Sequence, residues 1–68
     1  MHLTVNGKPR DAQGTGTIKE FLETNGVNPM LVAVEHNGEI IKRERFAEVT
    51  LADGDNLEII HMVGGGAA

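Results

Sequence analysis

Only one stretch of this chain has the apolar spacing of an α-helix, and residues that cap helices mark both of its ends. Three apolar residues at positions i, i+3 and i+4 share one helical face: Ile18, Phe21 and Leu22. Thr17 and Glu20 match a capping box at the start, and Gly26 suits the left-handed conformation that ends many helices. The sequence therefore predicts a single helix over residues 18–25, and the rest of the chain must supply the layer on which it packs.

Short strand-like runs surround this helix and are separated by turn signals. Leu3 and Val5 alternate with polar residues, which is typical of a half-buried strand. Asn6-Gly7 is the strongest short hairpin signal, Asn37-Gly38 repeats it, and Asp53-Gly54-Asp55 marks a third turn. The predicted strands are residues 2–5, 8–12, 31–34, 39–41 and 57–63.

This order of elements predicts an α+β fold of the β-grasp (ubiquitin-like) type, a mixed four- to five-stranded sheet with one helix packed across it. The run from Leu57 to Val63 is apolar on both parities, which indicates a central strand that is covered on both sides and pairs in parallel with the first strand. Phe46 and Val49 are expected to anchor the preceding loop, and the charged stretch 42–45 to be solvated. The predicted core comprises Leu3, Val5, Ile18, Phe21, Leu22, Leu31, Ala33, Leu57 and Ile59.

The composition argues against several classes of function. Ten acidic residues against six basic ones give a net charge of −4, and only two residues are aromatic, so nucleic-acid binding is not expected. No run approaches the roughly 18 apolar residues of a membrane span, and the first residues lack the pattern of a signal peptide, so we expect a cytoplasmic protein. The chain has neither Cys nor Ser, two common catalytic nucleophiles. Three histidines lie on different elements without the spacing of a metal site: His2, His36 and His61.

The end of the chain is the one part that offers chemistry. Residues 1–63 are predicted to form the β-grasp domain and residues 64–68 a flexible glycine-rich tail, because consecutive glycines lose more entropy on ordering than other residues. Such a tail is either frayed or a reactive arm, thin enough to carry a terminal carboxylate into a narrow channel. Four acidic residues beside the turns are expected to serve surface or turn roles: Glu35, Glu39, Asp53 and Asp55.

Segments spread over nearly the whole chain carry a resemblance to a known family. They are Val5-Asn6-Gly7-Lys8 and the residue ranges 17–22, 32–41, 43–46, 53–55 and 57–66. The last segment, an apolar strand that runs into glycines, is the most specific of them. On these segments the chain resembles the ThiS family, ubiquitin-like sulfur carriers that supply sulfur for the thiazole ring in thiamine biosynthesis.

The resemblance implies a carrier that is a protein co-substrate and not an enzyme. The carboxylate of Gly66 would be adenylated by an E1-like adenylyltransferase of the ThiF type, which uses ATP and magnesium, while the carrier binds no cofactor itself. Sulfur that originates from a cysteine desulfurase would then convert the adenylate into a thiocarboxylate, which a thiazole synthase of the ThiG type consumes. Gly64 and Gly65 would keep the tail thin.

The chain departs from the family pattern at its end. Family members usually end at the diglycine that corresponds to Gly65-Gly66, and here Ala67 and Ala68 follow. While they remain, the free carboxylate belongs to Ala68. Three interpretations stay open: a peptidase removes both alanines, the tail is used as it stands with altered partners, or the alanines are an incidental extension.

Two alternative functions also stay open. One is a sulfur carrier for molybdopterin, cysteine or methionine synthesis, and the other is a β-grasp interaction module without tail chemistry. For docking of the activating enzyme and the thiazole synthase, the candidates are Ile60 and Met62, which share the strand parity opposite to Leu57 and Ile59. The alternative is that a loop covers both residues.

Overall fold

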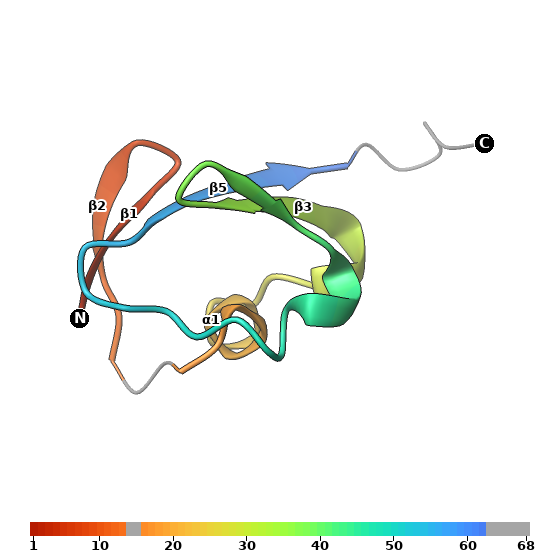
Figure 1. The fold of residues 1–68 in the computed structure, drawn as a ribbon, viewed down its shortest axis with the longest axis horizontal. Coiled ribbons are helices and arrows are strands. Elements are labelled where there is room, and N and C mark those ends of the chain that lie inside the picture. Colours follow the sequence, from red (N-terminus) through yellow and green to blue (C-terminus); the bar gives the residue numbers. More distant parts are fainter. Residues whose placement is uncertain (14–15, 63–68) are drawn as a thin grey trace.

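The computed structural model describes residues 1–13 and 16–62, and within them one five-stranded sheet lies against one helix. Figure 1 shows the sheet above and the helix α1, seen along its axis, below it. The elements are β1 (His2–Val5), β2 (Lys8–Asp11), α1 (Ile18–Thr24), the 3₁₀ turn η1 (Pro29–Leu31), β3 (Val32–His36), β4 (Glu39–Ile41), the 3₁₀ turn η2 (Arg43–Arg45) and β5 (Asn56–His61). The strand order is β2-β1-β5-β3-β4, with β1 and β5 parallel and the other pairs antiparallel. The predicted β-grasp fold is confirmed.

Both predicted Asn-Gly turns join antiparallel strands. Asn6 and Gly7 have φ of 53° and 80°, and Asn37 and Gly38 have φ of 51° and 86°. Two successive positive φ values are the geometry of a type I′ turn, whose twist matches the twist of the paired strands. The sequence signal therefore sets the register of the β1–β2 and β3–β4 hairpins.

The helix is capped at both ends as predicted. The Thr17 hydroxyl accepts from the Glu20 N–H at 3.2 Å, and the Glu20 carboxylate accepts from the Thr17 N–H at 2.9 Å, which completes a capping box. The helix ends at Thr24, one residue earlier than predicted. Gly26 follows with φ of 72°, and Val27 folds back so that its N–H donates to the last helical turn at 2.8 Å. This is the Schellman arrangement that a C′ glycine favours.

The core lies between the helix and the sheet and contains most of the predicted residues. Leu3, Ile18, Phe21, Leu22, Leu57 and Ile59 are buried, whereas Val5 is half-buried and packs against this core. The long loop between β4 and β5 runs beside the helix (Figure 1). Phe46 in this loop is buried and Val49 packs on the core, as predicted. The core also contains buried residues that were not predicted, among them Ala12, Ile41 and Leu51.

The prediction that Leu31 and Ala33 face the core is wrong. Both are exposed, and Val32 and Val34 are buried in their place. The reason is the turn η1, which Asn28 caps by accepting from the Met30 N–H at 2.9 Å. This turn takes up Leu31, so the strand begins at Val32, and a shift of one residue exchanges the two faces of a strand.

Candidate functional site

The residues with predicted chemistry follow the last strand, and the structure describes the chain as far as Met62. The tail residues Gly64, Gly65 and Gly66 and the processing residues Ala67 and Ala68 lie outside the described residues. The site that the structure does describe is the platform from which this segment continues, namely β5 and the residues that hold it.

Asn6 fixes β5 on its β1 side. The pairing of β1 with β5 reaches Val5 opposite Leu57, after which the chain turns into the first hairpin. The Asn6 side chain then continues the ladder: its Nδ2 donates to the Ile59 carbonyl at 3.2 Å, and the Ile59 N–H donates to its Oδ1 at 2.7 Å. One amide thus replaces a main-chain partner, because it offers one donor and one acceptor side by side. The sequence indicated only the turn role of Asn6.

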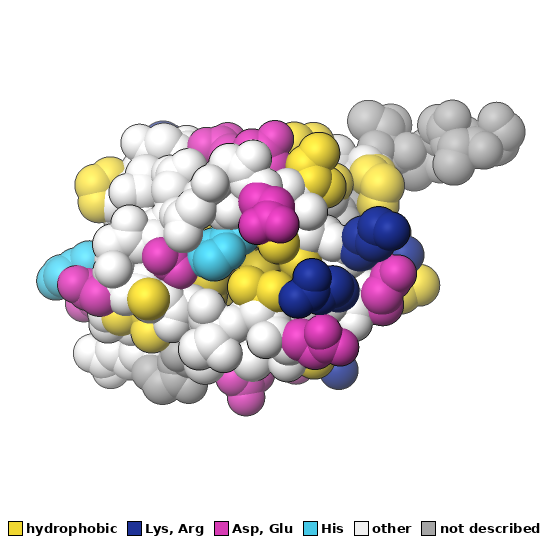
Figure 2. Space-filling view, in the orientation of Figure 1, with side chains coloured by type: hydrophobic (Ala, Val, Ile, Leu, Met, Phe, Trp, Pro, Cys, Tyr) yellow, Lys and Arg dark blue, Asp and Glu magenta, His cyan; other side chains and the backbone are white. Residues whose placement is uncertain are grey.

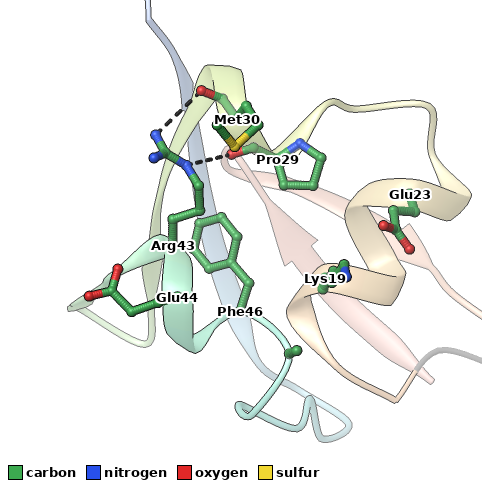
Figure 3. Close-up of a pocket in the computed structure, with 8 residues that line it drawn as sticks. Lys19, Glu23, Pro29, Met30, Arg43, Glu44 and Phe46 are labelled. Atoms are coloured by element: carbon green, nitrogen blue, oxygen red, sulfur yellow. Dashed lines mark hydrogen bonds between the residues drawn. The ribbon is translucent and has the colours of Figure 1, made fainter.

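Arg43 and the turn η1 hold β5 on its β3 side. The Met62 N–H donates to the Leu31 carbonyl at 2.9 Å, which extends the β3–β5 ladder beyond His61. The Arg43 guanidinium in turn donates to the carbonyls of Pro29 and Met30, each at 3.3 Å (Figure 3). Arg43 lies in the charged stretch that was predicted to be solvated. It is exposed, but it also fixes the turn whose last carbonyl receives Met62.

The same turn borders a groove between α1 and η2. Its volume is about 440 Å³, Phe46 lies beside Arg43 in its wall, and Lys19 and Glu23 line its helix side (Figure 3). This groove lies on the helix side of the molecule, whereas Ile60 lies on the opposite face of the sheet.

The outer face of the sheet, which we define as the face opposite the helix, carries exposed apolar side chains. Ile60 is 56% exposed and Met62 47% exposed. Ala33 lies directly opposite Ile60 in the β3–β5 register, and Ile40 on β4 is 73% exposed. The prediction that β5 is covered on both sides is therefore wrong, although its central position is confirmed. The alternative that a loop covers Ile60 and Met62 is also wrong within the described chain.

Acidic side chains accompany this apolar surface. Figure 2 shows acidic and hydrophobic side chains next to one another along the upper rim, over the strands, whereas Lys and Arg side chains gather over η2. The residues predicted to dock partners, Ile60 and Met62, are thus exposed, and their docking role stays a prediction. The acidic side chains beside the apolar ones are an addition that the sequence analysis did not contain.

A polar network ties the second hairpin to the start of β5. His36 Nε2 lies 2.7 Å from Asp55 Oδ2, and both side chains are half-buried, at 17% and 14% exposure. Asp55 also accepts from Asn37 Nδ2 at 3.1 Å and from the Ala52 N–H at 2.9 Å, and Asn37 Oδ1 accepts from the Asn56 N–H at 2.8 Å. Asp55 is therefore a turn residue, as predicted, and also the centre of a cross-link between two loops.

Removal of the Asp55 carboxylate is expected to cost about 2 kcal/mol of unfolding free energy at pH 7, because its hydrogen-bond donors lose a charged acceptor. Burial by itself raises the pKa of Asp55, but the hydrogen bonds from His36, Ala52 and Asn37 lower it more, and the pKa lies below its ordinary value of 3.8. A carboxylate whose pKa is lower in the folded state than in the unfolded state stabilises the fold at pH values above the unfolded-state pKa. This stabilisation is lost as the pH falls through the folded-state pKa. Urea denaturation of wild type and Asp55→Ala should therefore give a difference that is full at pH 7 and shrinks below about pH 3.8.

The matched control for this prediction is Asp11→Ala. Asp11 is 64% exposed, and its removal should change stability by less than about 0.5 kcal/mol. An Asp55→Ala difference that is the same at pH 7 and at pH 3 would contradict the assigned role of the carboxylate.

The other histidines do not join this network. His2 and His61 are exposed. Within residues 1–13 and 16–62, no group of three or more His, Cys, Asp or Glu side chains is placed to hold a metal ion.

Comparison with known proteins identifies the family of this chain. Residues 3–66 match the model of the ThiS family. The chain belongs to the ThiS family. The sulfur carrier protein ThiS of Bacillus subtilis is 46% identical over 65 residues, which cover 94% of this chain and 98% of that protein. The crystal structure of the thiamine biosynthesis protein ThiS from Geobacter metallireducens is 42% identical, has a TM-score of 0.82, and is covered completely by 97% of this chain.

A second group of relatives is longer. A thiazole synthase of Paramagnetospirillum magneticum is 40% identical over 67 residues, which cover 98% of this chain but only 21% of that protein. The chain thus spans about a fifth of that relative, and the match does not extend to the rest of its length. The predicted ThiS family membership and the class of function, a sulfur carrier of thiamine biosynthesis, are confirmed. Among the described residues, no helix is long and apolar enough to cross a membrane.

Proposed function

We propose that this protein carries sulfur as a thiocarboxylate on Gly66 and is itself a protein co-substrate and not a catalyst. The observation that carries this proposal is the extent of the family match, which includes Gly64, Gly65 and Gly66 and stops before Ala67. The described residues support it, because Asn6 and Arg43 hold β5 from both sides and fix the point from which the tail continues.

The proposed chemistry needs an activated carboxylate. The Gly66 carboxylate attacks the α-phosphorus of ATP in an E1-like adenylyltransferase of the ThiF type, and pyrophosphate leaves. The terminal sulfur of a persulfide, derived from a cysteine desulfurase, then attacks the acyl carbon, and AMP leaves with the bonding electron pair. A thiol reductant cleaves the S–S bond of the resulting acyl disulfide, which leaves the thiocarboxylate on Gly66 and a disulfide as the oxidised product. The ATP and the magnesium ion belong to the activating enzyme in this proposal, and a closed site there protects the mixed anhydride from water.

The length of the tail limits how far from a docked partner's reacting atom the end of β5 can lie. Gly66 is the fourth residue after Met62, and even a fully extended segment of four residues spans at most about 14 Å. The α-phosphorus of the ATP bound to the activating enzyme must therefore lie about this distance or less from the end of β5. We propose that Ile60 and Met62 dock both the activating enzyme and the thiazole synthase, since exposed apolar patches mark interfaces and Met adapts to more than one partner.

The two alanines after Gly66 make a processing step part of the proposal. A peptidase that removes Ala67 and Ala68 would free the Gly66 carboxylate, and the full chain would be a precursor. The thiazole synthase as a partner is supported by the relatives of that name that contain a segment similar to this chain. The cytoplasmic location stays a prediction.

Mass spectrometry of the protein purified from its own organism tests the proposal. The expected species ends at Gly66 and is heavier than the 66-residue carboxylate by the difference between one sulfur and one oxygen atom. Growth with added thiamine is the control, because it removes the demand for sulfur transfer. If only the 68-residue carboxylate is found under thiamine limitation, the proposal fails.

A further inference from the structure

Two carboxylates face each other on the outer face of the sheet. Glu35 on β3 and Glu58 on β5 are directly opposite in the antiparallel register. In an antiparallel ladder, hydrogen-bonded residue pairs alternate with pairs that are not hydrogen-bonded. Leu31 is hydrogen-bonded to Met62, and Asn37 to Asn56. Glu35 and Glu58 lie an even number of residues from both of these pairs, so they also occupy a hydrogen-bonded pair position. Their Cα atoms are therefore about 5.5 Å apart. Like charges directly opposite one another destabilise a sheet, so this pair is unfavourable for the isolated protein.

Nothing in the described chain neutralises this pair. Neither carboxylate forms an ion pair or a side-chain hydrogen bond within residues 1–13 and 16–62, although both residues are half-buried. The only Lys and Arg residues within the described strands are Lys8 and Arg10. They lie opposite Val5 and Leu3 in the β1–β2 register and therefore on the helix side of the sheet, away from the two carboxylates. Lys42 follows β4 and is exposed, and it makes no ion pair with either carboxylate.

Exposed apolar residues surround the two carboxylates. Ile40 lies opposite Glu35 on the β4 side, and Ile60 follows Glu58 on the same face of β5 with Ala33 as its partner. A half-buried pair of negative charges inside an apolar surface is suited to bind one positively charged side chain of a partner, provided that apolar residues of the partner lie around that side chain.

We infer that Glu35 and Glu58 together receive one basic side chain of the thiazole synthase, an Arg in preference to a Lys. A guanidinium has five N–H donors in a planar fork and can donate to both carboxylates at once, and it is less strongly hydrated than an ammonium group. The apolar residues next to that Arg would cover Ile40 and Ile60. This inference rests on the proposed function, and it adds the chemistry by which the partner recognises the carrier.

A second copy of this chain fits the surface less well. Two outer faces in contact would bring four carboxylates together, and the strands supply no Lys or Arg on that face to compensate. The charge of the surface thus favours a basic partner over self-association.

Binding of the full 68-residue chain to the thiazole synthase of its own organism, measured by titration calorimetry, tests the inference. We expect Glu35→Gln and Glu58→Gln each to weaken binding about tenfold. The same substitutions should raise the melting temperature of the free carrier by about 1–5 °C, because they remove the repulsion between the two carboxylates. Added salt should weaken wild-type binding more than binding of the double variant.

Glu39→Gln is the matched control. It removes one charge from the same hairpin, but Glu39 has the parity of Ile41 and not of Ile40, so binding should not change. If Glu35→Gln and Glu58→Gln bind like wild type while Ile60→Asp does not bind, the inference is overturned and the docking surface stands. If wild type does not bind the synthase at all, the proposed partner and the inference both fail. If wild type forms a dimer that Ile60→Asp dissociates, the outer face serves self-association and the inference is overturned.

Discussion

Phe21→Ala is expected to unfold this protein at physiological temperature. Phe21 is 2% exposed and belongs to the same buried core cluster as Ile18, Leu22 and the sheet residue Leu57. Removal of a buried phenyl ring costs about 3–5 kcal/mol, the transfer term plus the cavity. A single core in a chain of this length supplies no more than about 3–5 kcal/mol of net stability. Circular dichroism should therefore show loss of the cooperative thermal transition.

The control for this prediction lies on the same helix. Glu23 is exposed, and Glu23→Ala should change stability by less than about 0.5 kcal/mol because Ala favours a helix and no buried contact is lost. A Phe21→Ala variant that melts like the wild type would show that the core does not depend on the helix in the way the packing indicates.

The elements that the sequence predicts well are those whose signals act over a few residues. The helix follows from the Thr17–Glu20 capping box and Gly26, and both hairpins follow from Asn-Gly, since each signal fixes backbone geometry locally. The chain order of strands and helix was then sufficient to predict the β-grasp topology, including the parallel pairing of β1 with β5.

The face that each residue presents was less predictable in the third strand. The run from Leu31 to Val34 is apolar throughout, so the sequence does not indicate which parity faces the core. The Asn28 cap and Pro29 decide it, because they form a 3₁₀ turn that ends at Leu31. Asn followed by Pro is a known start for a helical turn, so a local signal for this turn is present in the sequence.

The candidate site divides in the same way. The composition of the chain end predicts the glycine-rich tail, and the strand parity predicts that Ile60 and Met62 face away from the core. The roles of Asn6, Arg43 and Asp55, and the meeting of Glu35 with Glu58, depend on contacts between residues 13 to 53 positions apart in the chain. Such contacts exist only once the register between distant strands is set, and no short sequence pattern encodes them.

The largest functional effect is expected at the end of the chain. The 66-residue chain that ends at Gly66 should be adenylated, and the 68-residue chain should react at least about 100-fold more slowly, because two further residues displace the carboxylate from the α-phosphorus of ATP. Both forms are incubated with the E1-like adenylyltransferase, ATP and magnesium, and pyrophosphate release and the mass of the acyl-adenylate are followed. Gly65→Val in the 66-residue chain should also block activation, while its melting temperature stays unchanged, because position 65 follows the described fold.

The outcomes of this comparison separate the interpretations of the two alanines. If the full chain is activated at Ala68 as readily as the shorter chain at Gly66, the alanines are harmless and no processing peptidase is required. If the Gly65→Val variant is activated normally, the channel of the activating enzyme does not require a tail without side chains. If neither chain reacts with any E1-like enzyme of the organism, the thiocarboxylate proposal fails, and the exposed outer face then has the function of an interaction surface alone. Activation of the 66-residue chain alone would make removal of Ala67 and Ala68 the step that controls entry into sulfur transfer.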